Sequence, residues 1–251
     1  MRTGSTATFD RVRHRGPPGT GHSAAIAPEG ELSDFDNILS FRQYVVISTA
    51  TVHLAVYDTL ADWEYGHAVA RIRSGGSRES RDFSVATVGP TGEPVTTMGG
   101  VRILPDFALA DLDPGTSAML ILPGAALWDT DPAALAPYAR AAGAFLAAGV
   151  PVAAICGATA GLAREGLLDD RPHTSAVAEY LAATGYAGSA HYRDEPAVNA
   201  GGLITAGPTD PLAFAREIFA ELELYGPEAL DAWYRLHAFS DPDAYEVLMS
   251  S

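Results

Sequence analysis

Two short, wholly apolar runs constrain the fold of this chain most strongly. Residues 118–122 (AMLIL) lead directly into Pro123-Gly124, and residues 152–155 (VAAI) lead directly into Cys156. Runs this short and this apolar are typical of strands covered by helices on both faces of a parallel sheet. Helix-like segments alternate with them along the chain. The pattern therefore predicts an α/β fold with a parallel sheet between helices.

The rest of the chain from residue 51 onward continues this alternation. We expect further strands at 52–57, 83–88, 101–104 and 198–206, the last interrupted by Gly201-Gly202, and helices at 61–73, 132–148, 158–164, 176–184, 211–224 and 227–238, with a last turn or short helix at 241–249. One sheet accounts for residues 51–226 without a second domain.

The N-terminal segment differs in composition from the rest. Residues 1–43 are rich in Gly, Pro, Ser, Thr and Arg and have no sustained apolar period. We expect a disordered leader, or sequence upstream of the true translation start, whose removal leaves folding and activity intact. Residues 44–226 are then the folded domain, and residues 227–251 are a C-terminal helical extension of that domain.

Charge and composition exclude several function classes. The chain has 251 residues, with 16 basic residues, all arginine, against 31 acidic ones. The absence of lysine excludes Schiff-base and pyridoxal-phosphate chemistry and a Walker A loop. A net charge of −15 disfavours nucleic acid and membrane as partners. No signal peptide or 18-residue apolar window is present, so we expect a cytoplasmic protein.

Cys156 is the first candidate catalytic residue and the only cysteine, so no intramolecular disulfide is possible. It joins an apolar strand to a helix that begins with small residues, as a nucleophile at a sharp strand-to-helix turn requires. The helix N-terminus stabilises a thiolate, which predicts a thiol pKa below about 8.5. The alternative is a small buried hydrophobic residue.

Two acidic residues follow the first predicted strand. Glu64 and Cys156 both come after strand ends, which meet at one edge of a parallel sheet. A carboxyl group beside the thiol can act as general acid and base. We therefore expect Glu64 to share a proton with Cys156 and to have a pKa above its ordinary value of about 4.3. The alternative is an acidic pair that favours a helix start, and Asp62 fits this better than Glu64.

The turn after residues 118–122 supplies candidate oxyanion donors. The N–H groups of Gly124 and Ala125, with that of Gly157, could stabilise a developing negative charge. An ordinary strand-ending turn is the alternative. We expect Trp128 to roof the pocket, although an aromatic residue at such a position is as often part of the core or an interface.

These segments in their order resemble the DJ-1/PfpI superfamily (ThiJ, class I glutamine amidotransferase-like). The resemblance is carried by DWE after the first strand, LILPG, AICGATAGLA and VNAGGLITA, and covers about residues 51–225. It implies a flavodoxin-like three-layer sandwich with a mainly parallel central sheet, usually in a homodimer. It further implies that Cys156 is the elbow cysteine, Glu64 the acid that hydrogen-bonds it, and Gly124 the first glycine of the oxyanion turn.

The chain departs from the family pattern at its histidines. Peptidase-type members follow the cysteine with histidine, where this chain has Gly157. Many members carry a further histidine in a Thr-Thr-His motif, a position that Ala176 occupies here. His173, three residues earlier, could approach the thiol from its loop or could be a solvated residue at a helix start. His191 lacks the glutamate two residues later that amidotransferases require.

Three function classes stay open at this stage. They are a cysteine-dependent enzyme acting on a small reactive carbonyl, a redox-sensing or chaperone-like protein, and a scaffold with a vestigial site. We favour the first: a glyoxalase III-like lyase or hydrolase without cofactor or metal, in which Cys156 forms a thiolate adduct and Glu64 moves the proton. Cysteine peptidase, isonitrile hydratase and amidotransferase activities rank lower.

Overall fold

The two apolar runs form neighbouring parallel strands at the centre of a sheet. In the computed structural model, which describes residues 50–75 and 82–250, β6 (Ser117–Leu122) pairs with β7 (Val152–Ile155), with Leu120 opposite Val152. Every side chain of β7 is buried, as are the last four of β6. This burial on both faces explains why neither strand alternates apolar with polar residues.

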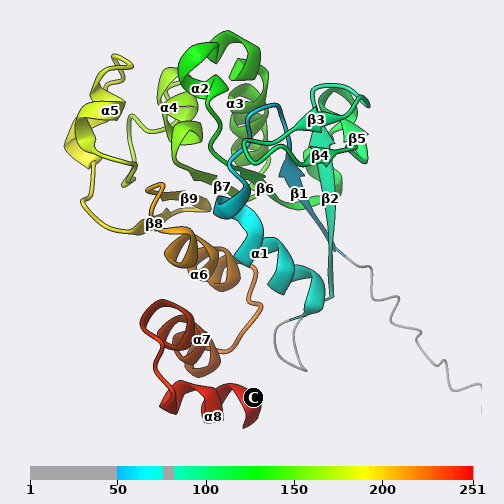
Figure 1. The fold of residues 1–251 in the computed structure, drawn as a ribbon. Helices are drawn as coiled ribbons and strands as arrows, with labels where there is room; N and C mark the ends of the chain where they lie inside the picture. Colours follow the sequence, from blue (N-terminus) through cyan, green and yellow to red (C-terminus); the bar gives the residue numbers. More distant parts are fainter. Residues whose placement is uncertain (1–49, 76–81, 251) are drawn as a thin grey trace, which may run out of the picture. The chain divides into compact units, whose positions relative to one another are not determined.

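The sheet has seven strands in the order β5-β2-β1-β6-β7-β9-β8 (Figure 1). The other strands are β1 (Ala50–Ala55), β2 (Phe83–Gly89), β5 (Phe107–Ala108), β8 (Ala197–Ala200) and β9 (Leu203–Ala206). All neighbouring pairs are parallel except β8 with β9. The predicted α/β fold with a mainly parallel central sheet is confirmed.

Two predicted strands have a different form in the structure. The expected strand at 198–206 is an antiparallel hairpin, because Gly201 and Gly202 take φ values of +63° and +82° and reverse the chain. The expected strand at 101–104 is only β4 (Arg102–Ile103), which pairs with β3 (Val95–Thr96) outside the main sheet. In both cases a turn pairs two segments that are adjacent in sequence as antiparallel strands.

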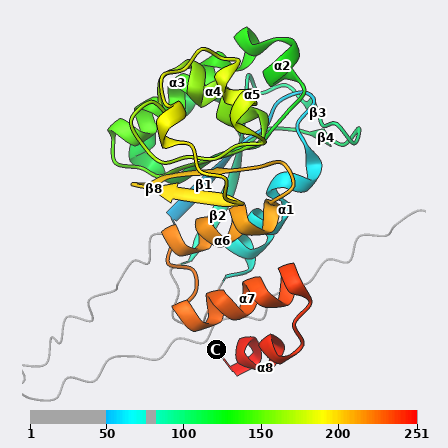
Figure 2. The ribbon, with the colours of Figure 1, turned by 90° about the vertical axis from the view of Figure 1, so that its left-hand side faces the viewer.

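Helices cover both faces of the sheet and complete the predicted three layers. On one face lie α1 (Asp62–Ser74) and α6 (Pro211–Glu221), which pack against each other. On the other lie α3 (Pro132–Ala147) and α4 (Gly157–Arg164) (Figures 1 and 2). Short helices lie next to α4, namely α2 (Leu127–Thr130) and α5 (Ala178–Ala182), and 3₁₀ turns occupy Leu109–Asp111, Pro114–Thr116 and Ser189–His191.

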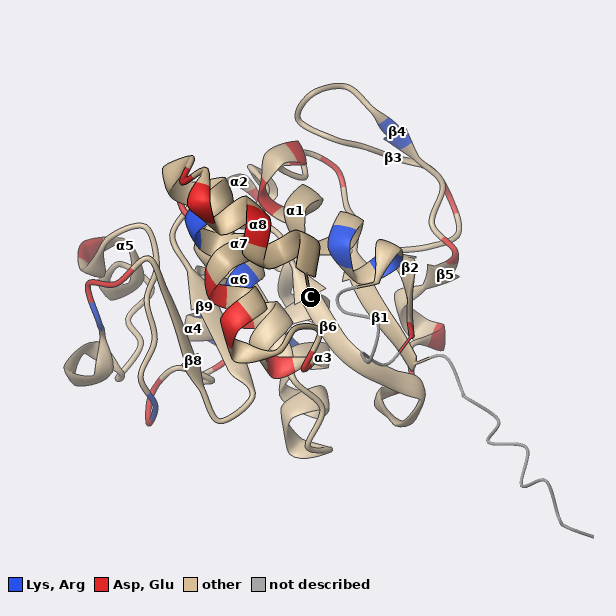
Figure 3. Cartoon of the chain, turned by 90° about the horizontal axis from the view of Figure 1, so that it is seen from below, with Lys and Arg blue, Asp and Glu red and all other residues tan. Residues whose placement is uncertain are grey.

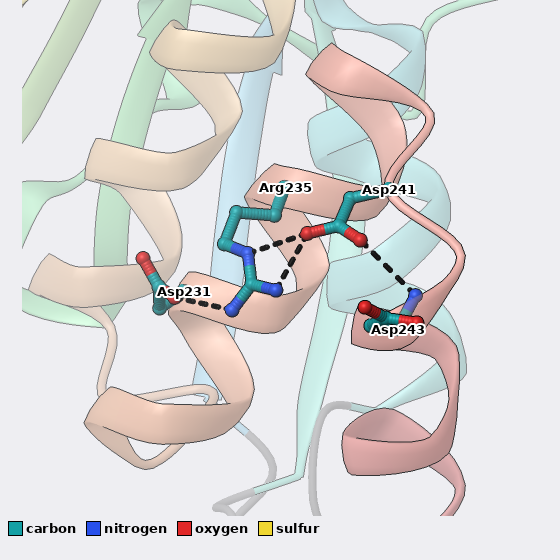
Figure 4. Close-up of polar contacts among 4 residues, drawn as sticks. All are labelled: Asp231, Arg235, Asp241 and Asp243. Atoms are coloured by element: carbon teal, nitrogen blue, oxygen red, sulfur yellow. Dashed lines mark hydrogen bonds and ion pairs between the residues drawn. The ribbon is translucent and has the colours of Figure 1, made fainter.

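The C-terminal residues form a helical pair, α7 (Pro227–Phe239) and α8 (Asp243–Ser250). Helix α7 packs against α6, where the buried Trp233 meets Phe219 with ring centroids 4.8 Å apart (Figure 2). Arg235 joins the two helices by donating to Asp241 Oδ2 from Nε at 2.8 Å and from Nη2 at 2.5 Å (Figure 4). The predicted helix at 227–238 is thus present. The predicted leader, residues 1–43, lies outside the described residues.

Acidic side chains outnumber basic ones on the C-terminal helices α6, α7 and α8 (Figure 3). This local excess agrees with the strongly negative charge of the whole chain. Within the described ranges, no helix combines the length and the apolar character that crossing a membrane requires.

Candidate active site

Cys156 lies at the strand-to-helix turn that the sequence predicts. It joins β7 to α4 with φ +58° and ψ −128°, a backbone conformation that residues other than glycine rarely adopt. Its N–H donates to Ala206 O at 3.1 Å, and its carbonyl oxygen accepts from Thr159 N at 3.1 Å and Thr159 Oγ1 at 2.6 Å. These bonds hold the strained residue, with its side chain half-buried.

The small residues after Cys156 make room for Trp128. A β-carbon on Gly157 would lie 2.9 Å from Trp128 Cβ, and one on Gly161 would lie 2.2 Å from Trp128 Cζ3. The indole is fully buried, and its Nε1 donates to Pro123 O at 3.1 Å. Trp128 therefore supports α4 from within the core. This placement agrees with the core alternative, and the prediction that Trp128 roofs the pocket stays a prediction.

The structure brings Glu64 and Cys156 together at Gly124. Glu64 lies in the first turn of α1, is 1% exposed, and accepts a 2.6 Å hydrogen bond from Gly124 N at Oε2. A β-carbon on Gly124 would lie 2.7 Å from that Oε2 and 3.0 Å from Cys156 Sγ. Only glycine at this position leaves room for the carboxyl group and the sulfur, which also hydrogen-bond each other.

The pKa of Glu64 moves in the direction that the sequence predicts, whereas that of Cys156 moves in the opposite direction. Burial raises the pKa of Glu64 to about 7, against the lowering effects of the Gly124 N–H and the thiol. This agrees with the predicted direction. The pKa of Cys156, predicted to be low, is instead raised to about 12 by burial, by the charge of Glu64 and by the hydrogen bond to that carboxyl group. The Gly157 N–H lowers it, but by less.

Burial therefore raises the pKa of both groups, and that of Glu64 is moved toward neutral pH. The second carboxyl oxygen, Glu64 Oε1, is buried and has no hydrogen-bond partner among the described residues. A buried polar atom without a partner costs free energy. This oxygen is thus available to receive a proton from the thiol or to donate one to a bound molecule.

The oxyanion donors differ in part from the prediction. The N–H of Gly124 is bound to Glu64, so it is not free to stabilise an oxyanion. The neighbouring turn is fixed by Ala61 N donating to Gly124 O at 2.9 Å and Ala126 N donating to Thr59 O at 3.3 Å. Between these bonds, the N–H of Ala125 has no acceptor in the part of the chain that the structure describes. Ala125 is therefore the available donor on this turn.

His173 has no hydrogen bond to the thiol among the described residues. Its ring is fully buried, with Nδ1 2.8 Å from Arg171 O and Nε2 3.0 Å from the Tyr186 hydroxyl oxygen. Both ring nitrogens are thus occupied by groups other than the thiol. The burial makes the solvated alternative wrong, while a role of His173 at Cys156 stays a prediction. Across the described ranges, no hydrogen bond links any histidine to Cys156.

Asp62 has a structural role away from the sulfur. Its Oδ2 accepts a 2.7 Å hydrogen bond from Gly99 N, and a hydrogen bond with Thr97 is the main cause of its lowered pKa. These contacts fasten the β3–β4 loop to the first turn of α1. These contacts and its place in the first turn of α1 agree with the helix-start alternative, and the assignment of Asp62 to the pocket stays a prediction.

Two residues near the thiol were missed by the sequence analysis. The Tyr180 hydroxyl of α5 donates to Asp129 Oδ1 of α2 at 2.7 Å. The charge of Asp129 contributes to the raised pKa of Cys156, and burial, together with the bond to Asp129, raises the pKa of Tyr180 above its usual range. Asp129 directly follows Trp128, but no local pattern could place Tyr180 beside it.

In the residues that the structure describes, no group of three or more His, Cys, Asp or Glu side chains could hold a metal ion.

Comparison with known proteins places these features in a family context. The model of the DJ-1/PfpI family matches residues 50–221. Two Bacillus subtilis (strain 168) proteins are similar: "Uncharacterized protease YoaZ", 37% identical over 82% of this chain and 99% of that protein, and "Uncharacterized protease YdeA", 28% identical over 70% and 85%.

Solved structures give the same picture. A thiJ/pfpI family protein from Bacillus anthracis has a TM-score of 0.76 at 38% identity, over 81% of this chain and 97% of that one. The DJ-1 superfamily protein Atu0886 from Agrobacterium tumefaciens has a TM-score of 0.65 at 34% identity, over 77% and 100%. Drosophila melanogaster DJ-1beta, at 23% identity and a TM-score of 0.56 over 74% and 96%, shares the fold.

Proposed function

Because the chain belongs to the DJ-1/PfpI family, we propose that it is a cofactor-free, cysteine-dependent enzyme that acts on a small reactive carbonyl compound. One observation carries the proposal: the buried carboxyl group of Glu64 and the sulfur of Cys156 meet next to Gly124, where they share a hydrogen bond. A carboxyl group that titrates near pH 7 beside a protonated thiol can take the proton as the sulfur attacks.

The first step forms a carbon–sulfur bond. With a 2-oxoaldehyde, ionised Glu64 removes the thiol proton while Sγ adds to the aldehyde carbon. The oxygen that becomes negative is stabilised by backbone N–H groups, of which the Ala125 N–H has no other described acceptor. Protonated Glu64 then returns its proton to this oxygen, which gives a hemithioacetal.

The second step moves hydrogen from the first carbon to the second. Glu64 removes the proton from the sulfur-bearing carbon, and the electron pair forms an enediol. Protonation of the adjacent carbon yields a 2-hydroxy thioester, which water hydrolyses to release the 2-hydroxy acid and the thiol. The first carbon is oxidised and the second is reduced, so no external oxidant or cofactor is needed.

Peptide hydrolysis is the second candidate, and it is favoured by the names of the Bacillus subtilis relatives. In this reaction protonated Glu64 would donate its proton to the departing amine. We rank this activity second because both ring nitrogens of His173 are bound elsewhere, and no other histidine among the described residues has a hydrogen bond to the thiol. Peptidase sites of the cysteine–histidine type rely on a histidine base.

The test is turnover of methylglyoxal to lactate by the wild type, Cys156→Ala and Glu64→Gln. We expect turnover by the wild type alone, with kcat/KM rising about tenfold per pH unit below pH 7 and levelling above it, because ionised Glu64 is the base. Absence of wild-type turnover would refute the proposal. Oxidation of Cys156 to sulfinic acid at low peroxide would then favour the redox-sensing alternative, and peptide cleavage the peptidase alternative.

A homodimer and a cytoplasmic location are further parts of the proposal, supported by family membership. Trp63, Met98 and Val101 are each at least 50% exposed. The bond between Asp62 and Gly99 links the segments that carry them. Such exposed apolar residues favour an interface. Sedimentation of the wild type and of Val101→Asp would test it, with a monomeric wild type as the contrary result.

A further inference from the structure

The hydrogen-bonded pair of Tyr180 and Asp129 is unused by the proposed mechanism although it lies near the nucleophile. Asp129 follows Trp128, whose β-carbon would contact a side chain at Gly157, the residue next to Cys156. Tyr180 comes from α5, which packs against α4, the helix that Cys156 precedes. The pair therefore joins α2 and α5 on the side of α4 near the thiol.

The direction of this hydrogen bond determines whether the Tyr180 hydroxyl group can donate or accept a further hydrogen bond. The Tyr180 hydroxyl donates its single proton to Asp129 Oδ1 at 2.7 Å. A phenol has one proton and free lone pairs, so its oxygen can now only accept a further hydrogen bond. The raised pKa of Tyr180, caused first by burial and then by Asp129, keeps the phenol neutral throughout the physiological range.

We propose that the Tyr180 oxygen, positioned by Asp129, accepts a hydrogen bond from the molecule reacting at Cys156 and thereby selects substrates with an O–H or N–H donor next to the reactive carbon. Suitable molecules are α-hydroxycarbonyl compounds and primary amides, and also the hemithioacetal that a 2-oxoaldehyde forms with Cys156, because its new hydroxyl group is such a donor. Tyr180 is then a specificity-determining residue and Asp129 a positioning residue. The inference deepens the proposed function, because it names a feature of the substrate for that site.

A matched pair of alkylating agents tests this without requiring turnover. Iodoacetamide carries N–H donors, whereas its N,N-dimethyl analogue carries none. Cys156 is the only thiol in the chain, so both rates report on this residue alone. The ratio of the two rates, divided by the same ratio for N-acetylcysteine, cancels any change in the thiol pKa that a variant causes.

We expect a ratio above one for the wild type. Tyr180→Phe and Asp129→Ala should each lower it about three- to tenfold, the size of one neutral hydrogen bond. Asp129→Asn keeps an acceptor for the phenol and should stay within about twofold of the wild type. Tyr245→Phe on α8, where the side chain is 55% exposed, is the matched control and should leave the ratio unchanged.

An unchanged ratio in Tyr180→Phe overturns the assignment of Tyr180. A normal ratio in Asp129→Ala overturns the positioning role of Asp129. Near-ultraviolet circular dichroism verifies folding, and either variant alone suffices to detect the loss if the other fails to fold. Failure of the proposed function is distinguishable, because methylglyoxal turnover would then be absent while the alkylation ratios still respond to Tyr180→Phe.

Discussion

Glu64 in the candidate active site and Asp241 in the C-terminal helical pair are carboxyl groups whose surroundings shift their pKa values in opposite directions. Glu64 is 1% exposed in the first turn of α1, and its described hydrogen-bond donors are the Gly124 N–H and the thiol. Asp241 lies between α7 and α8, partly exposed, with two bonds from the Arg235 guanidinium and one from the Asp243 N–H (Figure 4). Burial raises the pKa of Glu64, whereas the bond from Arg235 lowers that of Asp241.

The comparison shows that the surroundings of a carboxyl group decide whether it exchanges a proton near neutral pH or stays ionised. A buried carboxyl group without a cation beside it is costly to ionise, so it titrates near neutral pH and suits proton transfer. An exposed carboxyl group next to a guanidinium stays ionised and holds two helices in place. Substitutions at the two positions should therefore affect different properties.

The largest expected effect is the loss of turnover in the site region alone. Glu64→Gln keeps an oxygen that can accept from Gly124 N but cannot take the thiol proton, so kcat/KM should fall by about 10²–10⁴. Asp241→Asn should retain kcat/KM within about twofold. Steady-state methylglyoxal kinetics measure both. Equal losses of kcat/KM in the two variants would contradict the assignment of proton transfer to Glu64 and of a structural role to Asp241.

Stability against pH gives the next largest effect. Unfolded Glu64 ionises near its ordinary pKa, while the folded residue keeps its proton up to about pH 7. The free energy of unfolding should therefore fall as pH rises between these values, by about 3 kcal/mol, and then level off. Glu64→Gln lacks this fall, so it should gain stability relative to the wild type between pH 4 and pH 8. Urea unfolding at both pH values measures the difference, and a constant difference would contradict the burial of Glu64 as a titrating group.

Overpacking beneath the nucleophile should have a smaller effect. Gly161→Ala would place a β-carbon 2.2 Å from Trp128 Cζ3, so the indole or α4 must shift at a cost of about 1–3 kcal/mol. Gly226→Ala, at a residue that directly precedes α7 and has no atom within 4 Å of the added carbon, is the matched control in the C-terminal region. Thermal unfolding should separate the two, and similar melting temperatures would argue against tight packing under α4.

The smallest effect is expected from the exposed ion pair. Asp241 has a lowered pKa in the folded state, so its contribution is present at neutral pH and is lost as the pH falls through the folded value. Asp241→Asn should lower the melting temperature slightly at pH 7 and by less near pH 3, because exposed pairs contribute little. A larger effect at pH 3 than at pH 7 would reverse the assigned sign.

Periodicity and motif order were sufficient to predict much of the fold. The wholly apolar runs identify β6 and β7 because strands covered on both faces need no polar side chains. The late strand was misjudged because whether Gly201-Gly202 interrupts a strand or reverses it depends on the φ values that the two glycines adopt. The place of His173 depended on Tyr186 and Arg171, whose contacts with its ring no local pattern encodes.

The sequence by itself determined the α/β fold, the family and the position of Cys156 between a buried strand and a helix, because these depend on local hydrophobic patterning and chain order. Only the tertiary structure decided the directions in which the pKa values of Glu64 and Cys156 move. The helix start after Cys156 suggested a low thiol pKa, but burial and the approach of Glu64 past Gly124 raise it. Desolvation and charge act through distances between segments far apart in the chain, which is why the sequence could name the two groups but not their pKa values.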